Sequence, residues 1–166
     1  MTNIDKVFKA MISYYAGDVK QVNHFTKVYG FSKEIGAMEG LNGEAQEILE
    51  IAALTHDIGI KNSKIKYQNS NGENQQIEGP LEARKMLEVF SIDECIIERV
   101  CWLIAHHHMY NNIDSIDYQI LVEADFLVNI FEDGMSLEAI KSVRKKIFKT
   151  ESGLYILDAL FLSNQQ

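Results

Sequence analysis

All five histidines of this 166-residue chain lie in three short segments, VNHFTKV, LTHDIG and IAHHHMY. They are His24, His56 and the run from His106 to His108. Each segment lies within or at the end of a stretch with apolar residues at helical spacing, where a polar ring without a partner would cost about 1–3 kcal/mol. Asp125 is similarly embedded in the apolar run LVEADFLVN, where a carboxylate is costly unless it is paired or bound to a metal. We therefore expect that something engages each of these side chains.

A divalent metal ion is the partner that these residue types favour. The doublet His56–Asp57 ends an apolar run. Because adjacent helical residues differ in direction by only about 100°, the doublet can direct one imidazole nitrogen and one carboxylate oxygen into the same cavity. Mixed histidine and carboxylate ligands suit divalent Mn, Fe, Co, Ni, Zn or Mg. Each histidine taken alone has a simpler interpretation as a hydrogen-bonded core or surface residue, but together they predict a metal site.

The order of these residues resembles the H…HD…D signature of the HD-domain superfamily of metal-dependent phosphohydrolases. VNHFTKV resembles the first motif of that superfamily, LTHDIG its doublet, and VEADFLV its final aspartate with flanking apolar residues. The likeness extends over most of the chain, from Val22 to Asn129. It implies an all-α domain of the HD type with a buried metal site between helices, and an enzyme that hydrolyses phosphate esters.

The resemblance also implies the metal ligands. In that superfamily the first histidine, the doublet and the last aspartate bind one metal. The corresponding ligands here would be His24, His56, Asp57 and Asp125. One ion is therefore expected.

A second ion is left open. Superfamily members with two metals add a histidine after the doublet and a later His-His pair, and the aspartate of the doublet bridges both ions. His106 and His107 match the later pair, although the register within the run 106–108 is open by one residue. The intermediate histidine is missing, and of the two possible substitutes, Gln75 and Glu78, Glu78 is the better oxygen donor. These residues would either hold a second ion or act on substrate or water.

The predicted reaction is hydrolysis of a phosphomonoester or phosphodiester bond in a small phosphorylated molecule, with a nucleotide as the first candidate. A metal held by Asp57 and its neighbours would lower the pKa of bound water from about 15.7 toward neutrality, and the resulting hydroxide would attack phosphorus. Glu78 or a histidine of the 106–108 run, His106 and His107 first, would carry the proton.

Two lysines are predicted to bind the substrate. Lys27 follows His24 at i+3, so both can project from one helix face toward a bound phosphate. Lys61 lies on the segment after the doublet and could close over an anionic substrate. Surface solvation is the simpler interpretation of Lys64 and Lys66.

Two other functions remain open. A few members of the same superfamily hold a diiron centre and cleave carbon bonds with dioxygen, which requires two irons and all six ligands. A non-catalytic regulatory module would keep the metal pocket and bind nucleotides without turning them over. Metal content tests the first function, and binding without product formation would indicate the second.

Helices are expected to position all of these residues. A single proline and many apolar residues at helical spacing predict an all-helical chain, which we expect to form one domain over residues 1–166. Thr2 and Asp5 predict a capping box, and Pro80 suits the first turn of a helix. A polar stretch predicts a long loop over Lys61–Gly79. The expected helices cover about residues 2–15, 18 to the glycines at 36 and 40, 43–57 with Gly59 as its end, 81–90, 91–108, 116–132, 137–148 and 154–162.

Composition limits the partners. A net charge of −8 argues against a long nucleic acid, because nucleic-acid binders normally carry a basic surface. The first residues lack a secretory signal and the apolar runs are too short to span a bilayer, so a cytoplasmic protein without membrane contact is expected. Cys95 and Cys101 lack CxxC spacing and are expected to be reduced core thiols. Leu157, Leu160 and Phe161 could pack in the core or form the surface of a homodimer.

Overall fold

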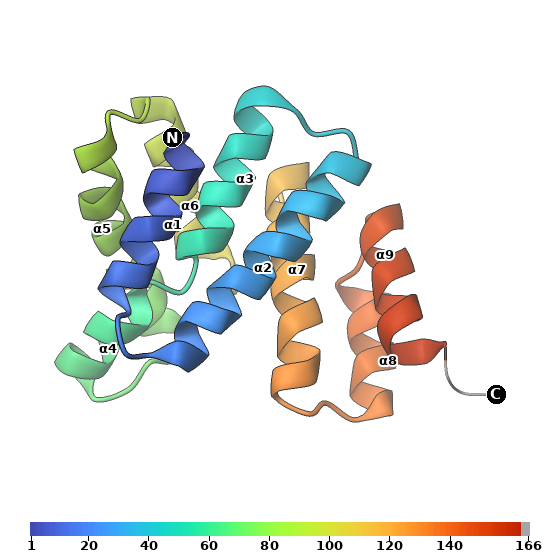
Figure 1. The fold of residues 1–166 in the computed structure, drawn as a ribbon. Helices are drawn as coiled ribbons and strands as arrows, with labels where there is room; N and C mark the ends of the chain where they lie inside the picture. Colours follow the sequence, from blue (N-terminus) through green and yellow to red (C-terminus); the bar gives the residue numbers. More distant parts are fainter. Residues whose placement is uncertain (164–166) are drawn as a thin grey trace.

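A computed structural model describes residues 1–163, and in these residues the chain forms nine α-helices and no β-strand (Figure 1). The helices are α1 (Asn3–Tyr14), α2 (Val19–Met38), α3 (Gly43–Thr55), α4 (Gly59–Tyr67), α5 (Gly72–Leu87), α6 (Glu94–His106), α7 (Ile116–Glu132), α8 (Leu137–Lys146) and α9 (Glu151–Leu157). The prediction of an all-α fold is therefore confirmed. Across residues 1–163, no helix is long and apolar enough to cross a membrane.

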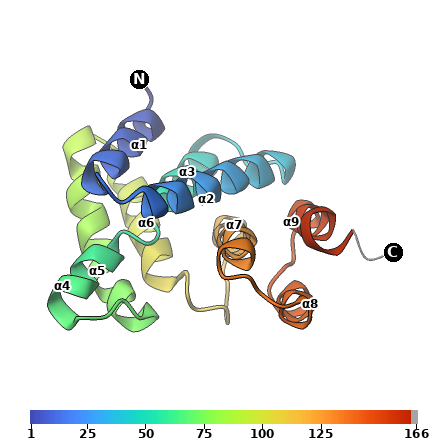
Figure 2. The same ribbon diagram turned by 60° about the horizontal axis from the view of Figure 1, so that its bottom comes forward.

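Helix α3 lies at the centre of the fold. Its residues from Ile48 to Thr55 are all buried, because the sequence ILEIAALT presents apolar side chains on nearly every face. Helices α1, α2, α6 and α7 pack around it. Helices α4 and α5 lie at one end of the molecule, and α8 and α9 lie at the other (Figures 1 and 2). The residues that follow α3 are consequently placed between several helices.

The predicted loop over residues 61–79 is wrong. Helices α4 and α5 occupy most of this segment, and residues 68–71 join them. Most polar side chains of α4 face solvent, whereas α5 buries one narrow face through Gln75, Gly79 and Ala83, which are spaced by four residues. Because this face contains few large apolar residues, the segment has no hydrophobic periodicity that would reveal a helix.

Gly59 and Pro80 have roles other than those predicted. Gly59 begins α4, where it lies against the backbone of α5. A Cβ at this position would lie 2.7 Å from Gly79 N and 2.9 Å from Gln75 O, so the close approach of the two helices requires glycine. Pro80 lies inside α5 and not in its first turn, so α5 continues through a residue without a backbone N–H.

Gly36 and Gly40, near the end of α2, have different roles. Gly36 does not end the helix, which continues to Met38. It is buried against α3, where a Cβ would lie 3.0 Å from Leu49 Cδ2. Gly40 follows the helix with a φ of 81°, the left-handed conformation in which glycine commonly ends helices.

Of the smaller predictions about helix caps and cysteines, some are confirmed and one is wrong. The capping box of α1 is confirmed, because Asp5 N–H donates to Thr2 Oγ1 and Thr2 N–H donates to Asp5 Oδ2. Cys101 is a buried free thiol as predicted. Cys95 is exposed, which corrects the expectation of a core thiol, because it lies in the first turn of α6 where the helix faces solvent.

The C-terminal part of the described chain consists of α9 and a π-helical turn, Asp158–Leu162. Helix α9 begins at Glu151, three residues before the expected start. Leu157 is fully buried in the core, whereas Leu160 is 54% exposed. The apolar residues considered for a dimer surface are therefore divided between core and solvent, and the homodimer stays a prediction.

A buried carboxylate attaches the beginning of α9 to α7. Glu123 is fully buried, and its carboxylate accepts hydrogen bonds from Lys149 N–H and Thr150 N–H at 2.6 and 3.0 Å. The Thr150 hydroxyl and the Gln119 side-chain amide also donate to it. Gly153 leaves the necessary space, because a Cβ there would collide with Glu123 Oε2.

A second carboxylate attaches α9 to α2. Glu39 directly follows α2, and its Oε1 accepts a hydrogen bond of 2.8 Å from Ser152 N–H. The first N–H groups of any helix have no partner within that helix, so acceptors from other elements satisfy them. The start of α9 is thus bonded to both α2 and α7.

Candidate metal centre

The His–Asp doublet lies in a tight turn between α3 and α4. Ile58 N–H donates to Thr55 O at 3.0 Å and closes the turn directly after α3. The hydroxyl of Tyr15, from the end of α1, lies 3.3 Å from Asp57 O and 3.2 Å from Ile58 O and donates to this pair of carbonyls. Because Ile58 is itself buried, the turn is fixed from both sides. The side chains of His56 and Asp57 are thereby held between the helices.

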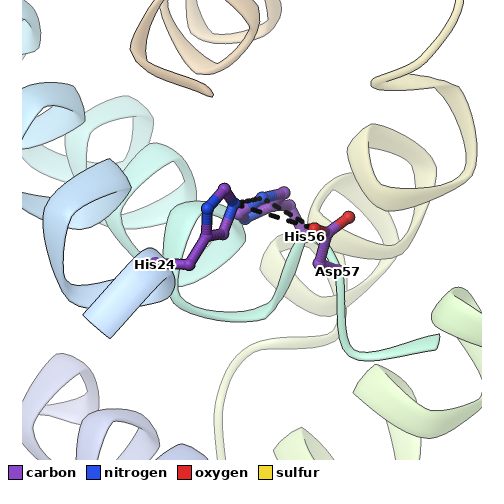
Figure 3. Close-up of side chains that lie close together, drawn as sticks. All are labelled: His24, His56 and Asp57. Atoms are coloured by element: carbon purple, nitrogen blue, oxygen red, sulfur yellow. Dashed lines mark hydrogen bonds and ion pairs between the residues drawn. The ribbon is translucent and has the colours of Figure 1, made fainter. Parts of the chain in front are cut away.

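Four potential ligand atoms converge at this turn, and we call the residues that supply them, His24, His56, Asp57 and Asp125, the primary group. Helices α2 and α7, which both pack against α3, supply His24 and Asp125. The Nε2 atoms of His24 and His56 face each other (Figure 3) and lie 3.2 Å apart. Asp125 Oδ1 lies 3.3 and 3.5 Å from them. Asp57 Oδ2 lies 3.7 and 3.6 Å from the same two nitrogens. Ligand bonds of about 2.1 Å place neighbouring ligand atoms about 3.0–3.4 Å apart, so this spacing is close to that around one ion.

The second nitrogen of each ring explains why the donor set attracts a proton or a metal cation. In three histidines around the turn, Nδ1 faces an oxygen that can only accept a hydrogen bond, so Nδ1 carries the proton. The pairs are His24 with Glu132 Oε2 at 2.9 Å, His56 with Ala53 O at 3.0 Å, and His107 with Ile104 O at 2.8 Å. In the neutral rings the Nε2 lone pairs therefore point inward. Lone pairs on nitrogens 3.2 Å apart repel unless a proton or a cation lies between them.

A second group of potential ligands lies on the other oxygen of Asp57. His107 Nε2 lies 3.2 Å and His108 Nε2 lies 3.9 Å from Asp57 Oδ1. Gln75 Oε1 lies 3.3 Å from His108 Nε2, and Gln75 Nε2 donates to Ser70 O at 2.7 Å. Ligand atoms of Asp57, His107 and His108 lie close enough together to hold an ion. We call Asp57, His107 and His108 the secondary group.

The structure places the histidine run in the register 107–108 and not 106–107. His106 is the last residue of α6, and its ring lies back along the helix. There Nδ1 donates to Trp102 O at 2.6 Å, and the ring stacks on Trp102 with centroids 4.0 Å apart. His107 and His108 lie beyond the helix end, where the turn directs them to Asp57.

Glu78 is not brought to either group. Its carboxylate accepts hydrogen bonds from Lys66 Nζ at 2.6 Å and from Tyr67 OH at 3.0 Å, both at the end of α4. The predicted loop would have left Glu78 free to reach a metal, whereas α5 fixes it toward α4. Gln75, one turn earlier on α5, is the residue that reaches the secondary group.

The two lysines predicted to bind substrate are engaged elsewhere. Lys27 Nζ donates to Glu132 Oε1. Lys61 Nζ donates to Tyr14 O at 3.1 Å and lies 4.7 Å from the centroid of the Tyr14 ring. Lys61 lines a separate cavity of about 380 Å³ that α1, α4 and the residues before α2 enclose. In this conformation neither lysine contacts a ligand atom of the two groups.

The pKa values of the carboxylates reflect the surrounding imidazoles. Burial alone would raise the pKa of Asp57, but His56 and His107 outweigh it and lower this pKa to about 2. Burial is likewise opposed at Asp125, where hydrogen bonds from His24 and His56 hold the pKa well below its usual range. Both carboxylates are therefore ionised at neutral pH and attract a cation.

The pKa values of the imidazoles shift in opposite directions. Burial alone would lower the pKa of His24, but nearby carboxylates, that of Asp125 first, raise it to about 9. The pKa of His56 is raised for the same reason, with the Asp57 carboxylate as the first opposing cause. The pKa of His108 falls to about 4 because of burial and the neighbouring His107 ring. The carboxylates thus favour a positive charge on the imidazoles of the primary group, whereas burial keeps His108 neutral at pH 7.

Three residues that the sequence interpretation missed support the ligands. Asn129 Nδ2 donates to Asp125 Oδ1 at 2.9 Å, and Glu132 accepts from His24. Asp125, Asn129 and Glu132 are spaced by four and three residues and share one face of α7. This spacing in the sequence could have indicated that Asn129 and Glu132 lie beside Asp125. Tyr15 carried no such signal, because an aromatic residue on an apolar helix face is indistinguishable from a core residue.

Comparison with known proteins gives two findings. The HD domain family model matches residues 22–149. Among solved structures, the chain is similar to the crystal structure of a predicted HD superfamily hydrolase from an uncultured Thermotogales bacterium. The TM-score is 0.67 and the sequence identity is 19%, with 93% of this chain and 83% of that chain covered. At this identity the similarity shows the fold alone, and no curated protein matches the chain in sequence.

The family match covers most of the chain and includes both groups of ligands. It runs from residue 22, in the first turn of α2, to residue 149, two residues before α9 begins. His24, the doublet and Asp125 occur in it in the order of the family signature, on the helices and the turn that bring them together. The chain therefore belongs to the HD domain family.

Proposed function

We propose that this chain is a metal-dependent hydrolase that cleaves a phosphomonoester or phosphodiester bond of a small molecule, with a nucleotide as the first candidate. The observation that carries the proposal is the convergence of His24, His56, Asp57 and Asp125 on one point between helices. Membership of the HD domain family supports it, and the similar solved structure is described as a hydrolase.

The primary group would hold the metal ion. Two imidazole nitrogens and two carboxylate oxygens accept divalent Mn, Fe, Co, Ni, Zn or Mg, so the donor set does not choose among them. When bound, such an ion acts as a Lewis acid and lowers the pKa of a coordinated water. The orientation of the ligands depends on the protein: Ala53 O fixes the ring of His56, and Asn129 fixes the carboxylate of Asp125.

The charges of the chain make phosphate binding depend on the ion. Asp57 and Asp125 are ionised and would repel an incoming phosphate, since two like charges about 4 Å apart repel by about 4 kcal/mol at an effective dielectric constant of about 20. Lys27 and Lys61, which could offset this repulsion, are bonded to other groups. We therefore expect a phosphate ester to bind the metal-loaded protein much more tightly than the metal-free protein.

His107 and His108 replace His106 and Glu78 as the candidate proton carriers. Both rings lie beside Asp57, within 3.2 and 3.9 Å of its Oδ1, where an attacking water is expected. If a second ion binds, the two rings would serve as its ligands, and the oxygen of Gln75 lies beside them. Either role requires the register 107–108.

The test is elemental analysis of the purified protein followed by a phosphate-release screen over nucleotides, with Mn, Co, Ni, Fe and Mg added in turn. Asp57→Asn keeps the shape of the side chain and removes its charge. We expect loss of bound metal and a fall in turnover of at least about 100-fold, because loss of a residue that only supports a ligand already costs about 10–100-fold. Glu138→Gln, an exposed residue of α8, is the matched control and should behave as the wild type. Equal turnover by wild type and Asp57→Asn would refute the proposal.

The two other functions are outcomes of the same experiment. Two bound irons with consumption of dioxygen and no phosphate release would replace the hydrolase by an oxygenase. Nucleotide binding without any product would replace it by a regulatory module.

A further inference from the structure

Three side chains form a continuous path from the protein surface to the primary group. Glu132 lies at the end of α7, with its side chain 16% exposed, and its Oε2 accepts a hydrogen bond of 2.9 Å from His24 Nδ1–H. Its Oε1 accepts from Lys27 Nζ, whose side chain is 44% exposed. Lys27 lies one turn after His24 on α2. Helix α7 therefore supplies both a ligand, Asp125, and the partner of the ligand on α2.

We propose that Glu132 is a positioning residue that sets the affinity of His24 for the metal, and that Lys27 holds Glu132 in place. The inference rests on the proposed metal site. A carboxylate that accepts the Nδ1–H of an imidazole fixes the tautomer and the rotation of the ring, and makes Nε2 a stronger donor to a cation. The bond is charge-assisted, and such bonds are shorter and stronger than those between neutral groups.

His24 differs from the other two inward-facing histidines in this respect. His56 and His107 donate Nδ1–H to main-chain oxygens three residues earlier in their own segments, Ala53 O and Ile104 O. Local backbone thus fixes both rings. The ring of His24 is instead fixed by a side chain from another helix, so its direction depends on Glu132.

Lys27 restricts the position of Glu132. A carboxylate with one bonded oxygen could rotate its free oxygen toward a cation and compete with Asp57 and Asp125 for it. The bond to Lys27 occupies the second oxygen and keeps Glu132 outside the ligand set. This assigns Lys27 a role different from the phosphate contact that its position after His24 suggests.

The experiment is a titration of the metal-free full-length chain with Co²⁺, followed by absorption spectroscopy, which reports both the affinity and the ligand field. Glu132→Leu removes the acceptor and should weaken Co²⁺ binding by about 10–100-fold, the range reported for outer-shell partners. Glu132→Gln keeps an oxygen acceptor without the charge and should give a smaller loss. Lys27→Met should change the affinity by only a few-fold. Glu138→Gln is the matched control for loss of a surface carboxylate.

The outcomes separate this inference from the proposed function. A wild-type chain that binds no Co²⁺ would remove the metal site itself. A wild-type chain that binds Co²⁺, together with unchanged affinity and an unchanged spectrum in Glu132→Leu, would overturn the role of Glu132 alone. If Glu132→Leu does not fold, Glu132→Gln decides, because it has nearly the same shape. A loss in Glu138→Gln as large as that in the Glu132 variants would mean a general charge effect and would also overturn the inference.

Discussion

Removal of the Glu123 carboxylate should destabilise the protein strongly without weakening metal binding. Glu123 lies two residues before Asp125, and two residues correspond to a rotation of about 200° on a helix, so the two carboxylates project from nearly opposite faces of α7. Asp125 faces the primary group, whereas Glu123 accepts hydrogen bonds from Gln119, Lys149 and Thr150. Glu123 should therefore contribute to folding and not to the metal.

The magnitude follows from the donors that lose their acceptor. Glu123→Ala leaves the N–H groups of Lys149 and Thr150 without a partner, and each buried unsatisfied donor costs about 1–3 kcal/mol. The Thr150 hydroxyl and the Gln119 amide also lose a bond, but water that enters the new space would offset part of this cost. We expect a decrease of about 3–5 kcal/mol in the free energy of unfolding, which is a large part of the roughly 5–15 kcal/mol typical of a domain.

Urea unfolding of the metal-free chain at pH 7 measures this effect. Glu123→Gln keeps an acceptor at the position of Oε1 and should cost only about 1–2 kcal/mol, since the neutral amide makes weaker hydrogen bonds. Glu138→Ala, an exposed glutamate of α8, should lie within about 0.5 kcal/mol of the wild type. A Glu123→Ala protein as stable as Glu138→Ala would refute the reasoning, as would a Glu123→Gln protein that folds but no longer binds Co²⁺.

Two further predictions concern packing and pH. Gly59→Ala should destabilise the protein by about 1–3 kcal/mol, because the new Cβ would press on the backbone of α5. Gly30→Ala, where the new Cβ would have nothing within 4 Å, should stabilise it by about 0.5–1 kcal/mol. Thermal unfolding of the two variants checks that the changes have opposite signs. Arg99 donates to Asp114 and Asp117, so Arg99→Met should cost about 1–3 kcal/mol at pH 7. Arg99 lowers the pKa of Asp114 from 3.8 to about 2. The stabilisation by Arg99 is therefore complete above the unfolded-state pKa of Asp114 and is lost as the pH falls toward 2. Urea unfolding curves of the variant and the wild type that stay equally far apart at low pH would contradict this prediction.

The helices that carry the primary group were readable from the sequence because their apolar residues are abundant and regularly spaced. Helix α7 has the predicted bounds, and α3 and α6 end within two residues of the expected positions. Helix α4 and the first half of α5 escaped detection, because the contact between these helices depends on the paired glycines Gly59 and Gly79 and on polar Gln75, none of which produces hydrophobic periodicity. The second half of α5 lies within the predicted helix over residues 81–90. A close approach of two backbones is not encoded in the pattern of apolar residues.

The candidate site was likewise predictable from the sequence only in part. The order of His24, the doublet and Asp125 was sufficient to expect that they meet. The register of the histidine run was not, because it depends on α6 ending at His106, and a shift of one residue at a helix end redirects every ring after it. The run LVEADFLVN contains two buried carboxylates with the same local surroundings in sequence, and only the elements packed on each face of α7 separate a structural Glu123 from an inward-facing Asp125.

The attachments of α9 link the end of the described chain to the spacing of the ligands. Glu39 and Glu123 bond the first residues of α9 to α2 and α7, the two helices that present His24 and Asp125. A segment that supplies no metal-ligand atom thus connects the two supports of the candidate metal site. In an HD protein with a shortened C-terminus, some other contact must keep these supports at a constant separation, and its loss would appear first as weaker retention of the ion.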